Sequence, residues 1–163
     1  MREYRKAAIA KRIGERPQTI QFWVKQGLLE PDIEPRQGKG KALVFSERNL
    51  LEAAMIHIIK ERQIVFLFTA REIMEGLRKG RYKNQVFKDF FDNPEWGETK
   101  ELIFKKLDHI GAGGFSIIEK DNHGYYRPDP LIFGSSIKQG TLLTVVMLGK
   151  IKQLALKILE KEK

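Results

Sequence analysis

Polar side chains follow Pro17 at spacings that place them on one face of a short helix. A glutamine amide can form two hydrogen bonds with the edge of an adenine base, and a threonine hydroxyl can contact a base or a phosphate. This face is therefore predicted to contact nucleic-acid bases in the major groove. For Phe22, a contact with a sugar or phosphate and partial burial are both open. The predicted face consists of Gln18, Thr19, Gln21, Phe22 and Lys25.

The opposite side of the same helix is apolar and would anchor it. Ile20, Trp23 and Val24 follow the i, i+3, i+4 spacing of a buried helical stripe. Pro17 suits the first helical position because it has a fixed φ and no N–H to leave unpaired. Trp23 is therefore expected in the core, with the polar residues on the outside.

The flanking sequence predicts a helix-turn-helix unit. A preceding helix is expected over residues 4–13, with Gly14 as its stop, and Gly27 ends the helix that carries the polar face. Two short helices joined by a tight turn are typical of a helix-turn-helix. A strand is expected over residues 43–45, and Ser46 is a good N-cap for a helix that runs to about residue 62.

Basic residues are concentrated at the two ends of the chain. The 163 residues carry a net charge of +9. Residues 1–45 hold ten Lys and Arg against five Asp and Glu, residues 150–163 hold five against two, and residues 63–149 hold twelve against eleven. This excess favours a polyanionic partner, nucleic acid before membrane. Two groups of basic residues are predicted to contact DNA phosphates: Arg36, Lys39 and Lys41 in a glycine-rich loop, and Arg5, Arg12 and Arg16 before it. For the loop residues the alternative is that they only face solvent.

In sequence and order, these elements resemble the DNA-binding domain of the MerR family. The resemblance rests on Ile9–Gly14, Pro17–Trp23, Gly27–Pro31 and Phe45–Glu47, with the basic glycine-rich loop between the last two. It covers roughly the first third of the chain. It implies a winged helix-turn-helix in a bacterial transcriptional regulator.

Three candidate functions are compared against these observations. The first is a sequence-specific transcriptional regulator that binds an inverted-repeat operator as a homodimer. The alternative is a non-sensing, excisionase-like or phage-type DNA-binding accessory protein that bends DNA. The third, an enzyme targeted to DNA, is disfavoured because the sequence offers no nucleophile–base pair, carboxylate cluster or phosphate loop. The chain is therefore predicted not to be an enzyme.

The rest of the chain is expected to be mostly helical. Helices are predicted over residues 69–79, 85–91 and 99–108, and a β-hairpin over 115–119 and 125–127. Residues 63–68 are a domain boundary or a buried connector. The predicted fold is mainly α: an N-terminal winged helix-turn-helix, then a mostly helical α+β region with a β-hairpin and a long terminal helix. The predicted domains are 1–62 for DNA binding, 63–140 for an effector or partner, and 141–163 for dimerisation.

The terminal helix carries an apolar seam. Met147, Ile151, Leu154 and Ile158 step by 4, 3 and 4 residues, which is the spacing of a heptad seam. Resemblance to MerR-like proteins, which dimerise through a long helix beyond the DNA-binding domain, implies that this seam is the dimer contact. Packing within the chain is the alternative.

Several classes of site are predicted to be absent. The chain has no cysteine, which excludes disulfides and thiolate metal sites. His57 is interpreted as structural, while His109 and His123 lack a second ligand at metal spacing, so no metal site and no cofactor are expected. The sequence shows no secretory signal and no membrane span, which predicts a cytoplasmic protein. The expected partners are double-stranded DNA and a second copy, with a small-molecule effector and RNA polymerase as further candidates.

Overall fold

The computed structural model describes residues 2–33, 43–82, 85–107, 113–123, 125 and 143–161. The chain forms two compact units, one of Met1–Glu75 with Leu154–Lys163 and the other of Gly76–Gln153. These limits differ from the predicted domain limits at residues 62 and 140, and the functional division of the chain stays a prediction. The loop predicted as the wing, residues 36–41, lies outside the described residues.

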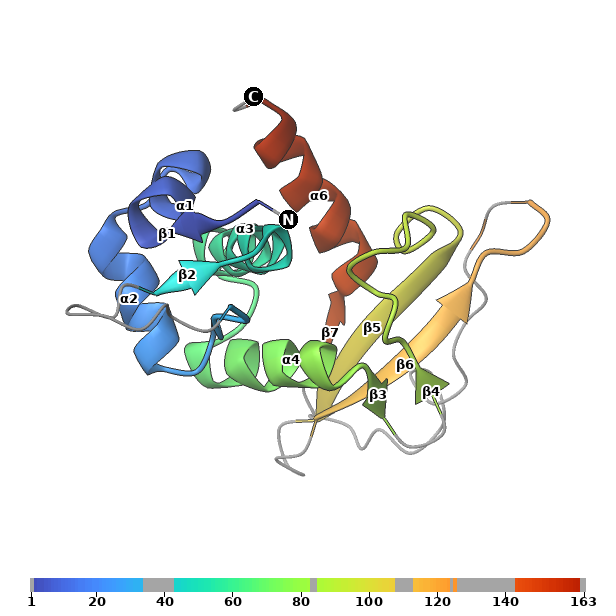
Figure 1. Cartoon of the computed structure of the whole chain (residues 1–163). Helices are drawn as coiled ribbons and strands as arrows, with labels where there is room; N and C mark the ends of the chain where they lie inside the picture. Colours follow the sequence, from blue (N-terminus) through green and yellow to red (C-terminus); the bar gives the residue numbers. More distant parts are fainter. Residues whose placement is uncertain are drawn as a thin grey trace. The chain divides into compact units, whose positions relative to one another are not determined.

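The first unit contains the predicted helix-turn-helix. Its elements are β1 (Tyr4–Arg5), α1 (Lys6–Ile13), α2 (Pro17–Lys25), β2 (Val44–Phe45), α3 (Glu47–Glu61), most of α4 (Leu67–Lys79) and the C-terminal part of α6 (Leu148–Lys161) (Figure 1). Helix α1 packs against α2 and α3. The helix predicted from residue 4 begins at Lys6 instead, because Tyr4 and Arg5 pair antiparallel with β2.

Glycine turns and an apolar core fix this arrangement. Gly14 adopts φ 72°, and its N–H points back to the carbonyls of the last turn of α1. A residue with a side chain is strained in that conformation, so Gly14 ends the helix and frees the chain to turn. The core comprises Ile9, Ile20, Trp23, Leu28, Phe45 and Met55, all at most 2% exposed.

A hydrogen-bonded cap joins the segment after α2 to the start of α3. The Ser46 hydroxyl accepts from the Asn49 N–H at 3.2 Å and donates to Asp32 Oδ2 at 2.5 Å. Asn49 is buried, and its amide donates to the Glu30 carbonyl at 2.8 Å. The predicted N-cap at Ser46 is confirmed. Because the cap also holds residues 30–32, it fixes the path of the chain that leaves α2.

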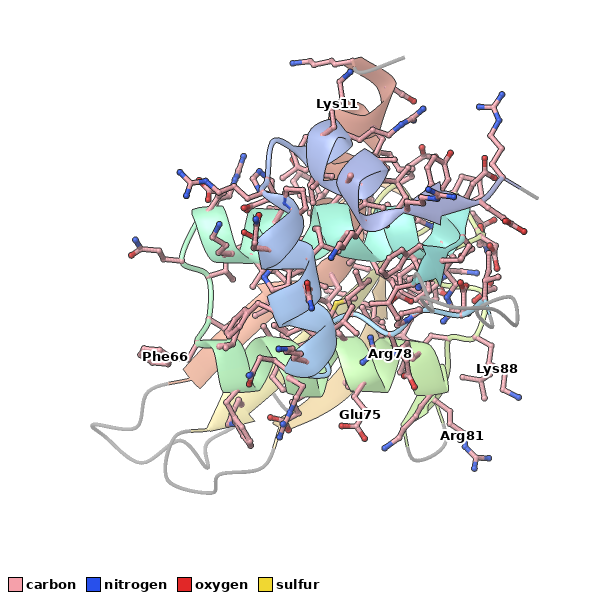
Figure 2. All side chains as sticks on the ribbon, turned by 60° about the vertical axis from the view of Figure 1, so that its left-hand side comes forward. Lys11, Phe66, Glu75, Arg78, Arg81 and Lys88 are labelled. Atoms are coloured by element: carbon pink, nitrogen blue, oxygen red, sulfur yellow. The ribbon has the colours of Figure 1, made fainter. Side chains whose placement is uncertain are left out.

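Helix α4 begins earlier than its sequence suggested. The predicted helix begins at residue 69, but α4 starts at Leu67 and Thr69 is buried within its first turn. Residues 63–68 do not form a buried connector, because Phe66, Leu67 and Phe68 are 88%, 46% and 62% exposed. Phe66 is labelled in Figure 2. Gly80 ends the helix as predicted, with φ 65°.

The second unit is built around a small antiparallel sheet. Besides the ends of α4 and α6 (Leu148–Lys161), it contains β3 (Arg81–Tyr82), β4 (Gln85–Val86), β5 (Lys100–Leu107), β6 (Gly113–Glu119) and β7 (Leu143–Met147). Strand β5 lies in the middle, in the order β6-β5-β7. Phe104 lies opposite Phe115 on one side and Val146 on the other. The pair β3–β4 forms a separate two-stranded sheet.

The prediction of a mostly helical C-terminal region is wrong for the described residues. Residues 100–107 form a strand rather than a helix. This strand is the central one of its sheet, so its apolar run is buried on both faces. A short apolar run of this kind lacks the alternation that would identify a strand from sequence. Residues 143–147 also form a strand, and the terminal helix begins at Leu148 rather than Thr141. The predicted helix over 85–91 is replaced by strand β4 and turns.

The predicted hairpin is corrected in the same region. Residues 115–119 do form part of strand β6, but that strand pairs with β5 rather than with the segment after it. Residues 126 and 127 of the expected second strand lie outside the described residues. The strand at 113–119 instead completes a hairpin with the strand before it in sequence.

Aromatic rings fill the core of the second unit. Phe104 and Phe87 each lie 5.2 Å from Phe115 between ring centroids, and Trp96 lies 5.7 Å from Phe90. All five side chains are at most 7% exposed. These rings form a packed core, which contributes more to stability than isolated aliphatic contacts of equal area.

Two buried charged residues, Glu101 and Lys152, lie in the same unit. The Glu101 carboxylate accepts a hydrogen bond from the Gly149 N–H at the start of α6. Burial raises the pKa of Glu101 to about 7. The Lys152 ammonium donates to the carbonyls of Phe90 and Asn93 at 2.5 and 2.7 Å, and burial lowers its pKa. Glu101 therefore makes the stability of this unit sensitive to pH near neutrality.

Candidate nucleic-acid interface

Helix α2 presents a polar face and is anchored by the opposite one. Ile20 and Trp23 are 0% and 2% exposed, whereas Gln18 and Gln21 are exposed. Figure 2, with the helix-turn-helix turned toward the viewer, shows α2 in front of α3. The helix is therefore held from behind by its apolar side chains and free to enter a groove on its other side.

The other residues predicted for this face are also accessible. Lys25 is exposed, Thr19 is half-buried, and Phe22 is 46% exposed directly beside the buried Trp23. The two neighbouring aromatics thus lie on different faces of α2, with Trp23 in the core as predicted and Phe22 partly exposed. Side-chain contacts of Phe22 with DNA stay a prediction.

Lys6 adds to this face, although the sequence analysis did not assign it. Its ammonium donates to Gln21 Oε1 at 3.0 Å. The bond uses the amide oxygen of Gln21 and leaves the amide N–H₂ group free to donate to a base acceptor. Its position in the first turn of α1, beside the basic Arg5, was the signal that could have identified it.

The basic residues predicted to contact phosphates fall into two groups. Arg5 and Arg16 are exposed, while Arg12 is half-buried, with its guanidinium carbon 5.4 Å from the centre of the Tyr4 ring. Lys11 is exposed on α1 and is labelled in Figure 2. The loop residues Arg36, Lys39 and Lys41 lie outside the described residues, so the wing and its phosphate contacts stay predictions.

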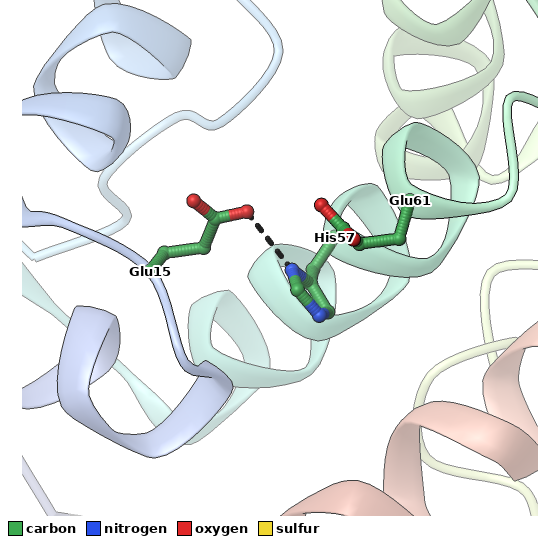
Figure 3. A group of neighbouring side chains, drawn as sticks. All are labelled: Glu15, His57 and Glu61. Carbon is green, nitrogen blue, oxygen red and sulfur yellow. Dashed lines mark hydrogen bonds and ion pairs between the residues drawn. The ribbon is translucent and has the colours of Figure 1, made fainter.

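A polar cluster behind the turn ties it to α3. Glu15, in the turn between α1 and α2, has a side chain only 8% exposed, and its Oε1 contacts His57 Nδ1 at 2.9 Å (Figure 3). Lys60 donates to the same oxygen at 2.6 Å. Burial alone raises the pKa of Glu15, but hydrogen bonds from Lys60 and His57 outweigh burial and hold the pKa below its usual value. The cluster therefore holds an ionised carboxylate behind the recognition turn.

The four residues of the predicted dimer seam lie on two different elements, β7 and α6. Met147 is on strand β7 rather than on the helix, and Ile151 is buried at 5% exposure. Leu154 and Ile158 are half-buried on α6, and Leu156, which the seam did not include, is 39% exposed. A continuous four-residue helical seam is therefore wrong, because the helix begins after its first member. Dimer contact through Leu154 and Ile158 stays a prediction.

Comparison with known proteins agrees with the geometry of the first unit. Residues 4–77 match the family model of the MerR HTH family regulatory proteins. A search of curated proteins gave no match. Among the described residues, none of the helices combines the length and apolar character needed to cross a membrane. The match spans α1, α2, α3 and most of α4, so the N-terminal part of the chain is similar to the helix-turn-helix domain of MerR-family regulators.

Proposed function

We propose that this protein is a transcriptional regulator that reads DNA through α2. The observation that carries the proposal is the two-sided character of this helix, with Trp23 buried and Gln18 and Gln21 exposed, in the segment that matches the regulatory family. In helix-turn-helix proteins the N-terminal residues of the second helix contact base edges. Gln18 and Gln21 supply the donors and acceptors for this readout, and Thr19 supplies a base or phosphate contact.

Basic side chains around α2 would fix its position on the duplex. Arg5, Arg16 and Lys25 are exposed near the polar face, and Lys6 is held beside Gln21. Contacts of this type with phosphates supply affinity and orientation without reading sequence. The loop residues Arg36, Lys39 and Lys41 are proposed to extend the same contacts as a wing.

We further propose that the protein binds as a homodimer. A single recognition helix reads only a short half-site, and two copies in fixed spacing supply the specificity that a regulator needs. Leu154 and Ile158, half-buried on α6, are the proposed contacts. A small-molecule effector and RNA polymerase are further proposed partners.

Selection of bound sites from random-sequence duplexes tests this function. The full-length protein is expected to enrich an inverted repeat whose half-sites are about 34–36 Å apart, one turn of the DNA helix. Enrichment of a single half-site would support DNA reading and contradict the dimer. No enrichment over a control without protein, at low and at physiological salt, would contradict the proposed function itself.

A further inference from the structure

Three side chains of metal-binding types converge where the turn after α1 meets α3 (Figure 3). Glu15 comes from the turn, while His57 and Glu61 lie one helical turn apart on α3. One nitrogen or oxygen atom from each lies within 4.8 Å of the other two. Ligand atoms around a tetrahedral Zn²⁺ with bonds of about 2.1 Å lie about 3.4 Å apart. Glu61 is more than half exposed, so a small rotation can bring its carboxylate to this spacing.

We propose that Glu15, His57 and Glu61 form a binding site for a divalent transition-metal ion, with Zn²⁺ the best suited. One imidazole and two carboxylates are a ligand set that this ion accepts, and three protein ligands leave a fourth position for water. The absence of cysteine disfavours soft ions such as Cu⁺. The sequence does not predict the site because Glu15 is 42 residues from His57, although His57 and Glu61 have an i, i+4 spacing.

The cluster already contains a positive charge, that of Lys60. The Lys60 ammonium lies 2.6 Å from Glu15 Oε1 and 3.4 Å from Glu61 Oε1, so it contacts both carboxylates of the proposed site. Its side chain is 48% exposed and can move into solvent at little cost. Lys60 and a metal ion would therefore compete for the same oxygens. Removal of the Lys60 ammonium therefore tests for a metal site, because it should strengthen the binding of a metal ion to these oxygens.

A bound ion would link two elements that position α2. Glu15 lies two residues before Pro17, and its side chain is nearly buried, whereas His57 and Glu61 belong to the α3 scaffold. Metal binding is therefore expected to stabilise the first unit and to raise its melting temperature as the concentration of free metal ion increases above the Kd. The proposal does not rest on DNA binding, because none of its three ligands is among the residues proposed to contact DNA.

The test is a calorimetric titration of the chelator-treated full-length protein with ZnCl₂, with Co²⁺ absorption as a second readout of coordination. Wild type is expected to bind one ion per chain through these ligands. His57→Gln, which keeps a hydrogen-bond donor near Glu15, and the surface variant Glu61→Gln are each expected to bind at least tenfold more weakly. His123→Gln, on an exposed histidine elsewhere, is the matched control and should bind as wild type does.

Lys60→Met gives the opposite expectation and separates the proposal from a loss of folding. Removing the competing ammonium while keeping its apolar stem should tighten Zn²⁺ binding at least threefold. Affinity unchanged in both His57→Gln and Glu61→Gln would overturn the site, as would weaker binding by Lys60→Met. No measurable heat and no Co²⁺ absorption for the wild type would overturn it directly.

Discussion

Replacing Trp23 by alanine is expected to lower the free energy of unfolding by about 3–5 kcal/mol. The indole is 2% exposed and anchors α2 against the core of the first unit, so its removal leaves a cavity beneath the recognition helix. Loss of this anchor should also abolish DNA binding, because the polar face is no longer held in place. Urea denaturation followed by far-UV circular dichroism measures the change.

Phe22→Ala is the matched control for this experiment. The two aromatics are adjacent in sequence, but Phe22 is 46% exposed on the other side of α2. Its replacement is expected to cost less than about 1 kcal/mol. Similar losses for both variants would contradict the assignment of one buried and one exposed face to this helix.

The stability of the second unit is expected to fall as pH rises toward neutrality because of Glu101. Its folded-state pKa of about 7 lies above the ordinary value of 4.5, so the folded protein binds this proton more tightly than the unfolded chain does. The contribution is fully present below pH 4.5 and is lost as pH rises through 7. A tenfold difference in proton affinity corresponds to about 1.4 kcal/mol. Protonated Glu101 therefore contributes about 3 kcal/mol to the free energy of unfolding.

Glu101→Gln should remove this dependence. The amide keeps an oxygen that can accept from the Gly149 N–H and carries no charge to bury. The variant is expected to be less pH-sensitive than wild type between about pH 4.5 and 8, and more stable at about pH 8. Chemical denaturation at several pH values provides the measurement, and Glu98→Gln, on an exposed carboxylate, is the control. Parallel stability curves for wild type and Glu101→Gln would contradict the assignment.

The helix-turn-helix was predictable because its local signals agree with its packing. Gly14 ends α1, Pro17 begins α2 and Ser46 caps α3, and each acts within a few residues. The apolar spacing of Ile20 and Trp23 then identifies the buried side. These start and stop residues act through local backbone and side-chain interactions, so they can be identified from a single sequence.

The second unit could not be predicted in the same way. Leu102, Ile103 and Phe104 are all buried because β5 lies between two other strands, and a run of this kind fits a buried helix equally well. The pairing of β5 with β7 joins residues about forty positions apart, and short-range sequence patterns do not predict such a pairing. The approach of Glu15 to His57 and Glu61 depends on the same kind of long-range folding.

Equilibrium competition on the selected DNA site measures whether α2 reads base sequence. Gln18→Ala and Gln21→Ala are each measured against the site and against single-base variants of it. Gln26→Ala, on an exposed glutamine just beyond the C-terminal end of α2, is the matched control. Gln18→Ala and Gln21→Ala are each expected to lose discrimination at one base position per half-site, by about 1–3 kcal/mol, while Gln26→Ala keeps it. Unchanged base preferences in both Gln18→Ala and Gln21→Ala would contradict base reading by α2.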